Sequence, residues 1–169
     1  LNHIMELTHE TPLPVTNLYQ TPKTLGKDRI AAVAGGQELF PSSNVLIIDA
    51  GTAITYDYLN KDQEYKGGNI SPGLSMRFRA LNQFTRRLPR LSKKDHAPLL
   101  GNNTEASIVA GVQNGIVFEM NQYINTLMSI STNLKTILTG GDSNFFDNKL
   151  NYPIFVEPDL VLIGLNKIL

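Results

Sequence analysis

Cysteine is absent from the sequence, and so is any excess of charge of one sign. Without cysteine the chain can form no disulfide, thiolate metal site or cysteine nucleophile, which suits a reducing cytoplasm. Fifteen basic residues balance fifteen acidic ones, so there is no electrostatic footprint for nucleic acid or an anionic membrane. No stretch approaches the roughly 20 apolar residues that a membrane-spanning helix needs. We therefore expect a cytoplasmic protein that binds neither nucleic acid nor membrane.

The composition is that of a folded globular protein. Hydrophobic residues make up 41% of the chain and charged residues 18%. Its 169 residues suffice for one sizeable domain, or for one domain and part of another. Residues 1–10 mix polar, charged and apolar types, so they do not resemble a secretory signal. The chain begins with leucine and not methionine, as a fragment of a longer gene product would.

The first half of the chain predicts a loop, a helix and a three-stranded meander. Residues 10–27 contain three prolines and predict an extended loop. A helix is expected from Asp28, whose carboxylate favours the helix dipole at the N-terminus. β-branched and aromatic runs predict strands at residues 45–48, 53–59 and around Tyr65. The first of these strands is nearly all apolar, so we expect it at the centre of an antiparallel meander.

The second half predicts alternating helices and strands. Residues 67–73 are expected to form a glycine-containing loop before a basic amphipathic helix at 74–88. A long helix is expected at 104–129, because apolar residues recur there every four positions, at Ile108, Val112, Ile116, Met120 and Ile124. A mixed α/β domain is completed by a strand at 136–138, a short helix, a strand at 153–156 and a helix from Pro158.

The turn Asp49-Ala50-Gly51-Thr52, after the first predicted strand, suits a phosphate site. Glycine lets backbone N–H groups approach phosphate oxygens, and threonine adds a hydroxyl donor. The carboxylate can hold a cation that offsets the phosphate charge. The alternative is an ordinary hairpin turn, in which aspartate and glycine are favoured for backbone reasons alone.

Gly26-Lys27-Asp28-Arg29 offers the groups that phosphorylation of a hydroxyl requires. An aspartate can act as the general base for the nucleophile, and a neighbouring arginine can clamp a substrate carboxylate in bidentate fashion. The alternative is that Asp28 only caps its helix while Arg29 faces solvent.

Three further glycine-containing segments are candidates. Thr139-Gly140-Gly141-Asp142 could let a phosphate or a flat ligand lie against the backbone, or it could be a tight turn with Asp142 as the helix cap. Segments 67–73 and 101–104 could be plain loops, in which Thr104 is the N-cap of the long helix.

These segments, in this order and at these spacings, closely resemble the type III pantothenate kinase family, from about Tyr19 to the C-terminus. The matching segments are Tyr19-Gln20-Thr21-Pro22-Lys23-Thr24-Leu25-Gly26-Lys27-Asp28-Arg29, Asp49-Ala50-Gly51-Thr52-Ala53, Gly67-Gly68-Asn69-Ile70-Ser71-Pro72-Gly73-Leu74, Gly101-Asn102-Asn103-Thr104 and Thr139-Gly140-Gly141-Asp142. The resemblance implies an α/β fold of the ribonuclease-H-like, actin-like ATPase type, with ATP between two such domains. It also implies ATP-dependent phosphorylation of pantothenate to 4'-phosphopantothenate, the first step of coenzyme A synthesis.

The resemblance assigns the substrate-binding residues. Asp28 would be the catalytic residue that accepts the proton of the pantothenate hydroxyl. Together with Asp28, the residues Gly26, Lys27 and Arg29 would form the stretch that contacts pantothenate. Tyr19 would lie nearby and bind the substrate as well.

The resemblance also implies the nucleotide, cation and subunit contacts. Asp49 would be the metal ligand for a monovalent cation, potassium or ammonium, and Mg²⁺ would accompany ATP. Thr52 would contact the ATP phosphates. Thr104 would touch pantothenate from the partner subunit of a homodimer. A second apolar set on the long helix is consistent with such an interface: Val109, Val117, Phe118 and Leu127.

One departure from the family is expected. Family members begin with a strand that ends in an Asp-x-Gly-Asn-Thr-type loop around the ATP phosphates, and residues 1–18 offer no apolar strand followed by aspartate and glycine. We therefore expect residues 1–43 to be a remnant of the first domain, with the substrate-binding loop and helix, and residues 44–169 to be the second. Most of the first domain would then be missing, and the chain as written would be inactive alone.

Two other functions stay open. A non-catalytic regulatory protein of the same fold, similar to a transcriptional activator, would need neither the base Asp28 nor the cation ligand Asp49. Retention of both residues favours the enzyme. Another kinase of the superfamily, acting on a sugar or on acetate, is disfavoured by Gly26–Arg29 with Tyr19 upstream.

Overall fold

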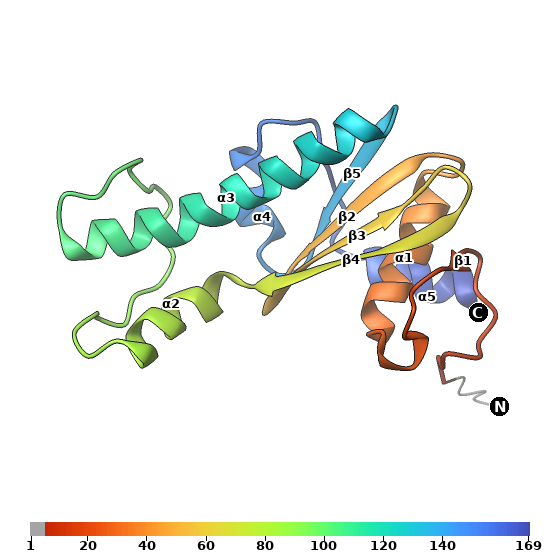
Figure 1. The fold of residues 1–169 in the computed structure, drawn as a ribbon, viewed down its shortest axis with the longest axis horizontal. Coiled ribbons are helices and arrows are strands. Elements are labelled where there is room, and N and C mark those ends of the chain that lie inside the picture. Colours follow the sequence, from red (N-terminus) through yellow and green to blue (C-terminus); the bar gives the residue numbers. More distant parts are fainter. Residues whose placement is uncertain (1–5) are drawn as a thin grey trace.

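The centre of the protein is strand β2 (Asn44–Ala50), in a six-stranded sheet of order β1-β4-β3-β2-β5-β6 (Figure 1). The computed structural model describes residues 6–169. β2 pairs antiparallel with β3 (Ala53–Leu59) and parallel with β5 (Leu134–Thr139). Its apolar side chains are buried on both faces, because helices cover both. The predicted meander with a central first strand is confirmed.

Strand β4 (Glu64–Pro72) is longer than the sequence predicts, since residues 67–72 belong to it and not to a loop. It pairs antiparallel with β3. A side chain on Gly68 would collide with the carbonyl of Tyr56, and Gly67 has a positive φ of 97°. The two glycines therefore allow a close approach of the strands next to an irregularity in their register. The prediction of a loop at these glycines is therefore wrong.

Helices α1 (Lys27–Leu39) and α5 (Leu160–Ile168) pack together on one face of the sheet. Their backbones approach closely, because a side chain on Gly164 would collide with the carbonyl of Ala31. Both helices begin within two residues of their predicted starts. The N-terminus of α1 is thereby held over the sheet, which places the residues of its first turn beside β2 and β3.

The opposite face is covered by the long helix α3 (Thr104–Ile130) and by α4 (Ser143–Phe146). The predicted apolar stripe of α3 is confirmed, because its members are at most 7% exposed: Ile108, Val112, Ile116, Met120 and Ile124. Of the second apolar set, Val109 is buried, and Val117 and Leu127 pack against the same core. Phe118 remains 58% exposed.

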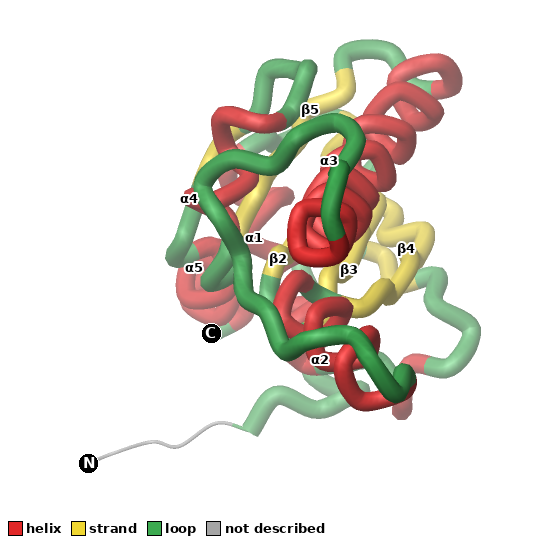
Figure 2. Tube along the Cα trace, turned by 90° about the vertical axis from the view of Figure 1, so that its left-hand side faces the viewer, coloured by secondary structure: helices red, strands yellow, loops and turns green. Residues whose placement is uncertain are grey.

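Helix α2 (Leu74–Phe84) projects from the edge of the sheet beside the first turns of α3 (Figures 1 and 2). It is shorter than the predicted 74–88. The Thr85 hydroxyl donates to the Leu81 carbonyl at 2.6 Å, and the Asn82 amide donates to the Leu88 carbonyl at 2.9 Å. Side chains thus bond to backbone carbonyls of the turn that the prediction assigned to helix, and the helix ends there.

A long connection, residues 85–103, links α2 to α3 and passes near α4 (Figure 2). The buried Gln113 of α3 holds it, since Gln113 accepts from the Lys94 N–H at 2.8 Å and donates to the Lys94 carbonyl at 3.0 Å. Asn103, and not Thr104, is the N-cap of α3, because its Oδ1 accepts from the Ala106 N–H at 2.9 Å. Thr104 is left without a capping task.

Short elements complete the fold. β1 (Thr16–Asn17) pairs parallel with β4, and β6 (Phe155–Val156) pairs parallel with β5. The 3-10 turns are η1 (Pro22–Thr24) and η2 (Asp147–Lys149). The two-residue β1 interrupts the loop predicted at 10–27. None of the described helices combines the length and apolarity needed to cross a membrane. The domain division at residue 43 stays a prediction.

Candidate functional site

Asp49 lies near the carboxyl end of β2, paired in register with Thr55 of β3 and Thr139 of β5. Its side chain is half-buried, and burial, followed by the negative charges of Asp28 and Asp57, raises its pKa above the ordinary value. Within residues 6–169 no lysine or arginine forms an ion pair with it. Asp49 is therefore a partly desolvated carboxylate whose charge this part of the chain does not balance.

The turn between β5 and α4 packs directly against Asp49. Gly140 has a positive φ of 90°, and a side chain there would collide with the Asp49 carboxylate and the Ala50 backbone. The Asp142 N–H donates to the Ala50 carbonyl at 2.9 Å, which fixes the turn against β2. Asp142 is at the N-cap position but makes no capping hydrogen bond, and its carboxylate instead pairs with Lys93 Nζ at 2.7 Å. The side-chain cap considered for Asp142 is absent.

The β2–β3 turn presents Thr52 on the same edge of the sheet. The carbonyl of Thr52 accepts from the Gly73 N–H at 3.0 Å, and a side chain on Gly73 would collide with the backbone of Gly51 and Thr52. The turn therefore lies flat against the start of α2. The Thr52 side chain is exposed, so its hydroxyl is free to meet a ligand.

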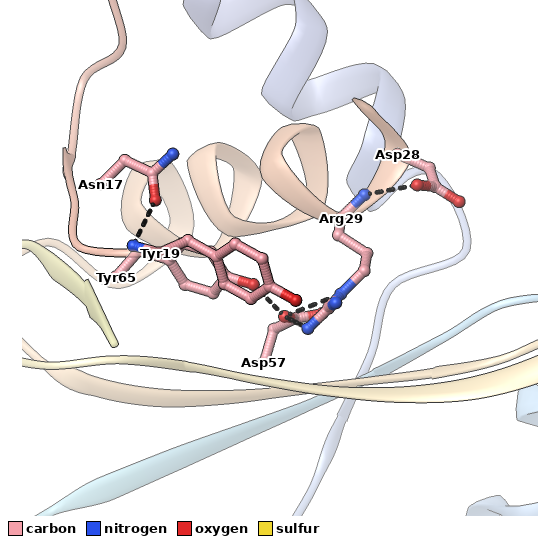
Figure 3. Close-up of polar contacts among 6 residues, drawn as sticks. All are labelled: Asn17, Tyr19, Asp28, Arg29, Asp57 and Tyr65. Atoms are coloured by element: carbon pink, nitrogen blue, oxygen red, sulfur yellow. Dashed lines mark hydrogen bonds and ion pairs between the residues drawn. The ribbon is translucent and has the colours of Figure 1, made fainter. Parts of the chain in front are cut away.

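Asp28 stands in the first turn of α1 with an exposed carboxylate. Its Oδ1 accepts from the Arg29 N–H at 2.8 Å, which fixes the side chain at the helix N-terminus (Figure 3). The N-cap residue is Gly26, and a Cβ there would lie 2.5 Å from Asp28 Oδ1. Glycine therefore keeps the space beside the carboxylate open.

The side chain of Arg29 turns inward. The alternative in which Arg29 faces solvent is therefore wrong. Its side chain is 6% exposed and forms an ion pair with Asp57 of β3, which is 1% exposed. Nε donates to the two Asp57 oxygens at 3.1 and 3.2 Å, and Nη2 donates to Oδ1 at 2.6 Å (Figure 3). Burial opposes the charge of Arg29, but the Asp57 contacts raise its pKa above the ordinary value. The Nε–Nη2 edge of Arg29 is thus bound by Asp57 of the same chain and not by a substrate carboxylate.

Tyr19 lies over this ion pair, and Lys27 lies outside it. The ring of Tyr19 stacks on that of Tyr65 at 6.1 Å and 7°, and Arg29 Cζ is 5.6 Å from the Tyr19 ring centroid. Lys27 is exposed and pairs with Glu6 at 2.8 Å. Of the predicted substrate residues, Tyr19, Gly26, Asp28 and Arg29 therefore surround one site, with Lys27 at its outer side.

Thr104 is not part of this group. It lies at the exposed start of α3, which Figure 1 shows at the end of the molecule away from α1. There α2 and α3 enclose an open groove of about 1100 Å³. Residues lining the groove include Arg77, Leu81, Phe84, Leu88, Thr104 and Ile108.

Asp57 and Tyr65 were not among the site residues predicted from the sequence. Asp57 alternates with Tyr56 and Tyr58 in β3, so it faces the α1 side of the sheet. The sequence did offer one indication of a role for Asp57, namely a single carboxylate within an otherwise apolar and aromatic strand. Among residues 6–169 no three histidine, aspartate or glutamate side chains converge on one point, and the metal role expected for Asp49 stays a prediction.

Known proteins resemble this chain over most of its length. The residue pattern of the family described as type III pantothenate kinase matches residues 3–126. The type III pantothenate kinase of Phocaeicola vulgatus is 54% identical over 167 residues, covering 99% of this chain and 69% of that protein. That of Bacteroides fragilis is 49% identical over 166 residues, covering 98% and 68%. A solved Campylobacter jejuni structure, named for the Baf family of transcriptional activators, is 26% identical with a TM-score of 0.65, covering 91% of this chain and 66% of that one.

Proposed function

The chain belongs to the type III pantothenate kinase family, with its ribonuclease-H-like fold, and from this premise we propose which residues act in the ATP-dependent phosphorylation of pantothenate. One observation carries the proposal: Asp28 presents an exposed carboxylate in the first turn of α1, and Asp49 stands half-buried near the carboxyl end of β2, the strand against which α1 packs. A base for the hydroxyl and a carboxylate at the phosphate-binding edge thus belong to two elements that pack together.

Asp28 is the general base of the transfer. The pantothenate hydroxyl oxygen bonds to the γ-phosphorus of ATP, the bond to the bridging oxygen breaks, and ADP leaves. The hydroxyl proton passes to a carboxylate oxygen of Asp28. The bond from the Arg29 N–H holds Asp28 in one orientation, and the open space at Gly26 lets the hydroxyl approach.

Asp49 is the ligand of a monovalent cation, potassium or ammonium. Its carboxylate fits that task, because it is partly desolvated and pairs with no lysine or arginine of the described part of the chain. Such a cation, with the Mg²⁺ of the nucleotide, would offset the phosphate charge. The exposed hydroxyl of Thr52 donates to the phosphates beside it.

Pantothenate lies along the N-terminus of α1. Gly26, Lys27 and Arg29 contact it, and Tyr19 covers it from the preceding segment. Lys27 exchanges its surface pairing with Glu6 for the substrate at little cost, because exposed ion pairs contribute only about 0–1 kcal/mol.

The active form is a homodimer in the cytoplasm, and Thr104 belongs to the partner's site. This assignment is supported by the distance between α1 and the start of α3 in the fold (Figure 1). It is also supported by exposed apolar side chains next to the groove between α2 and α3, among them Phe84 at 81% and Leu100 at 84%. A second copy covering this surface would remove them from water.

A regulatory role in place of catalysis is not favoured. The name of the Campylobacter jejuni structure suggests it, but that protein is only 26% identical. The kinases that match at 49–54% identity cover nearly the whole chain. Retention of Asp28 and Asp49 has a purpose in an enzyme and none in a binding protein.

A coupled kinase assay on the full-length gene product tests the proposal. Pantothenate is compared with a panel of sugars and short acids, in potassium and, separately, in sodium. We expect turnover with pantothenate alone and only in potassium. Folded protein that fails to phosphorylate pantothenate in both arms would favour the regulatory role.

A further inference from the structure

Asp57, on the α1 side of the sheet, accepts several hydrogen bonds. Besides the three bonds from Arg29, its Oδ1 accepts from the Tyr65 hydroxyl at 2.6 Å. Tyr65 is fully buried, and burial, followed by the charge of Asp57, raises its pKa, so its hydroxyl keeps the proton that it donates. Asp57 is thus bonded within its own chain and is only 1% exposed, so it is not available to a ligand.

Arg29, by contrast, has donors left over. Nε and Nη2 are used by Asp57, whereas Nη1 takes part in no hydrogen bond of residues 6–169. Nη1 is also not sealed from solvent, because within those residues only Gln37 Oε1 is a buried side-chain polar atom without a partner. The guanidinium thus has one edge clamped by Asp57, and its other edge lies toward Tyr19, whose side chain also helps to raise the pKa of Arg29 (Figure 3).

A structural ion pair alone would not need this arrangement. Burying two charges costs solvation that their attraction barely returns, and packed apolar residues of similar volume serve stability as well or better. Here the pair lies under Tyr19, and its arginine directly follows Asp28 in sequence. Arg29 also keeps donors that Asp57 does not use, on the side that faces the site. The feature that apolar residues could not reproduce is a rigidly aimed cation.

We infer that Asp57 and Tyr65 are positioning residues for pantothenate: they lock the inner edge of Arg29 so that its outer edge receives the carboxylate of the substrate beside Asp28. The inference rests on the proposed function, in which Gly26–Arg29 contacts pantothenate. Neither Asp57 nor Tyr65 touches the substrate. Their effect passes through Arg29 and through the stacking of Tyr65 on Tyr19.

The other face of the sheet provides a matched control. There the Tyr56 hydroxyl donates to Glu119 Oε1 at 2.8 Å, and Glu119 pairs with Arg77 at 2.6 Å. This second arginine–carboxylate–tyrosine group has the same chemistry, and Tyr56 is adjacent to Asp57 in β3. It faces α3 and not α1, so Tyr56→Phe removes an equivalent hydroxyl away from the proposed site.

The test compares Asp57→Asn, Tyr65→Phe and Tyr56→Phe in the full-length protein, by calorimetric binding of pantothenate and by steady-state kinetics. For Asp57→Asn we expect the pantothenate Kd and KM to rise about 10- to 100-fold, the range for loss of a charge-assisted hydrogen bond. Tyr65→Phe should raise them about three- to tenfold, and Tyr56→Phe by less than about twofold. The KM for ATP should stay constant in all three.

Each outcome bears on the inference. If the pantothenate Kd of Tyr65→Phe matches that of Tyr56→Phe, or if the KM values for ATP and pantothenate rise together, Asp57 and Tyr65 are structural only and the inference is overturned. Should Asp57→Asn fail to fold, as thermal unfolding would reveal, Tyr65→Phe still decides, because it keeps the ion pair. Failure of the wild-type protein to bind pantothenate would instead contradict the proposed function itself.

Discussion

The backbone of Gly140 lies against the carboxylate of Asp49, with no room for a side chain between them. The contact joins the turn after β5 to the end of β2, two segments about 90 residues apart in sequence that meet because β2 and β5 are parallel neighbours. Gly140 places no side chain over Asp49, so the half-buried carboxylate stays partly accessible at the carboxyl end of β2.

Gly140→Ala should destabilise the protein and displace Asp49. The left-handed backbone alone costs a non-glycine residue about 1–2 kcal/mol, and the collision with Asp49 adds to it. Thermal unfolding should shift downward, and the potassium concentration for half-maximal activity should rise. Gly141→Ala is the control, because a Cβ there has nothing within 4 Å. Equal behaviour of the two variants would show that the contact is unimportant.

Asp28→Asn should abolish turnover while pantothenate binding stays measurable. An asparagine keeps the shape of the side chain but cannot accept the hydroxyl proton, a loss of about 10²- to 10⁴-fold for a general base. Rapid-quench kinetics and calorimetry separate the two effects. Asp62→Asn, an exposed aspartate in the β3–β4 turn, is the control. Near-normal turnover of Asp28→Asn would exclude the role of base.

Co-expression of Asp28→Asn with Thr104→Trp should restore activity that neither variant has alone. If each site takes Asp28 from one subunit and Thr104 from the other, a mixed dimer has one intact site. Random pairing then returns about one quarter of wild-type turnover, since half of the dimers are mixed. The measurement is turnover of the unsorted mixture and of mixed dimers purified through two different tags, which should reach about one half of wild-type turnover. No recovery in them would mean that Thr104 serves its own subunit, or no site.

The pair Arg77–Glu119 should contribute to stability at neutral pH and lose its contribution in acid. Burial opposes ionisation of Glu119, but the bonds from Arg77 and Tyr56 lower its pKa below the ordinary 4.5. The folded state therefore favours the ionised form, so the stabilisation is present above about pH 4.5 and is lost as the pH falls through the lower folded-state pKa. Urea unfolding of Glu119→Gln between neutral and acid pH should give a flatter dependence than wild type. A slope equal to that of wild type would contradict this; Glu105→Gln, exposed on the same helix, is the comparison.

Local sequence pattern was enough for the elements whose apolar residues match their burial, periodic in α3 and continuous in β2. The apolar stripe of α3 and the apolar run of β2 predicted which residues are buried, because each lies against a continuous core. β4 was cut short because Gly67 and Gly68 carry no side chain to report burial, and their purpose is a contact with β3 that only the paired structure reveals. Local rules lack that information.

The site divides in the same way. Motif order was sufficient to select Asp28 and Asp49, which the structure places on the packed elements α1 and β2. It could not show that Arg29 turns inward, because its partner Asp57 is 28 residues away on a strand whose register decides the meeting. The placement of Thr104 in the partner's site came from the family resemblance alone, and the position of the start of α3, away from α1, is consistent with it (Figure 1).

The adjacent residues Tyr56 and Asp57 also act as a check on the assembly of the sheet. Their side chains satisfy separate arginine–carboxylate–tyrosine groups on opposite faces of β3. A slip of β3 by one residue would turn Asp57 toward Glu119 and leave Arg29 buried without an anion. A misaligned hairpin therefore incurs two electrostatic penalties at once. The same two neighbours that serve the folded protein thus reject the wrong alignment while it folds.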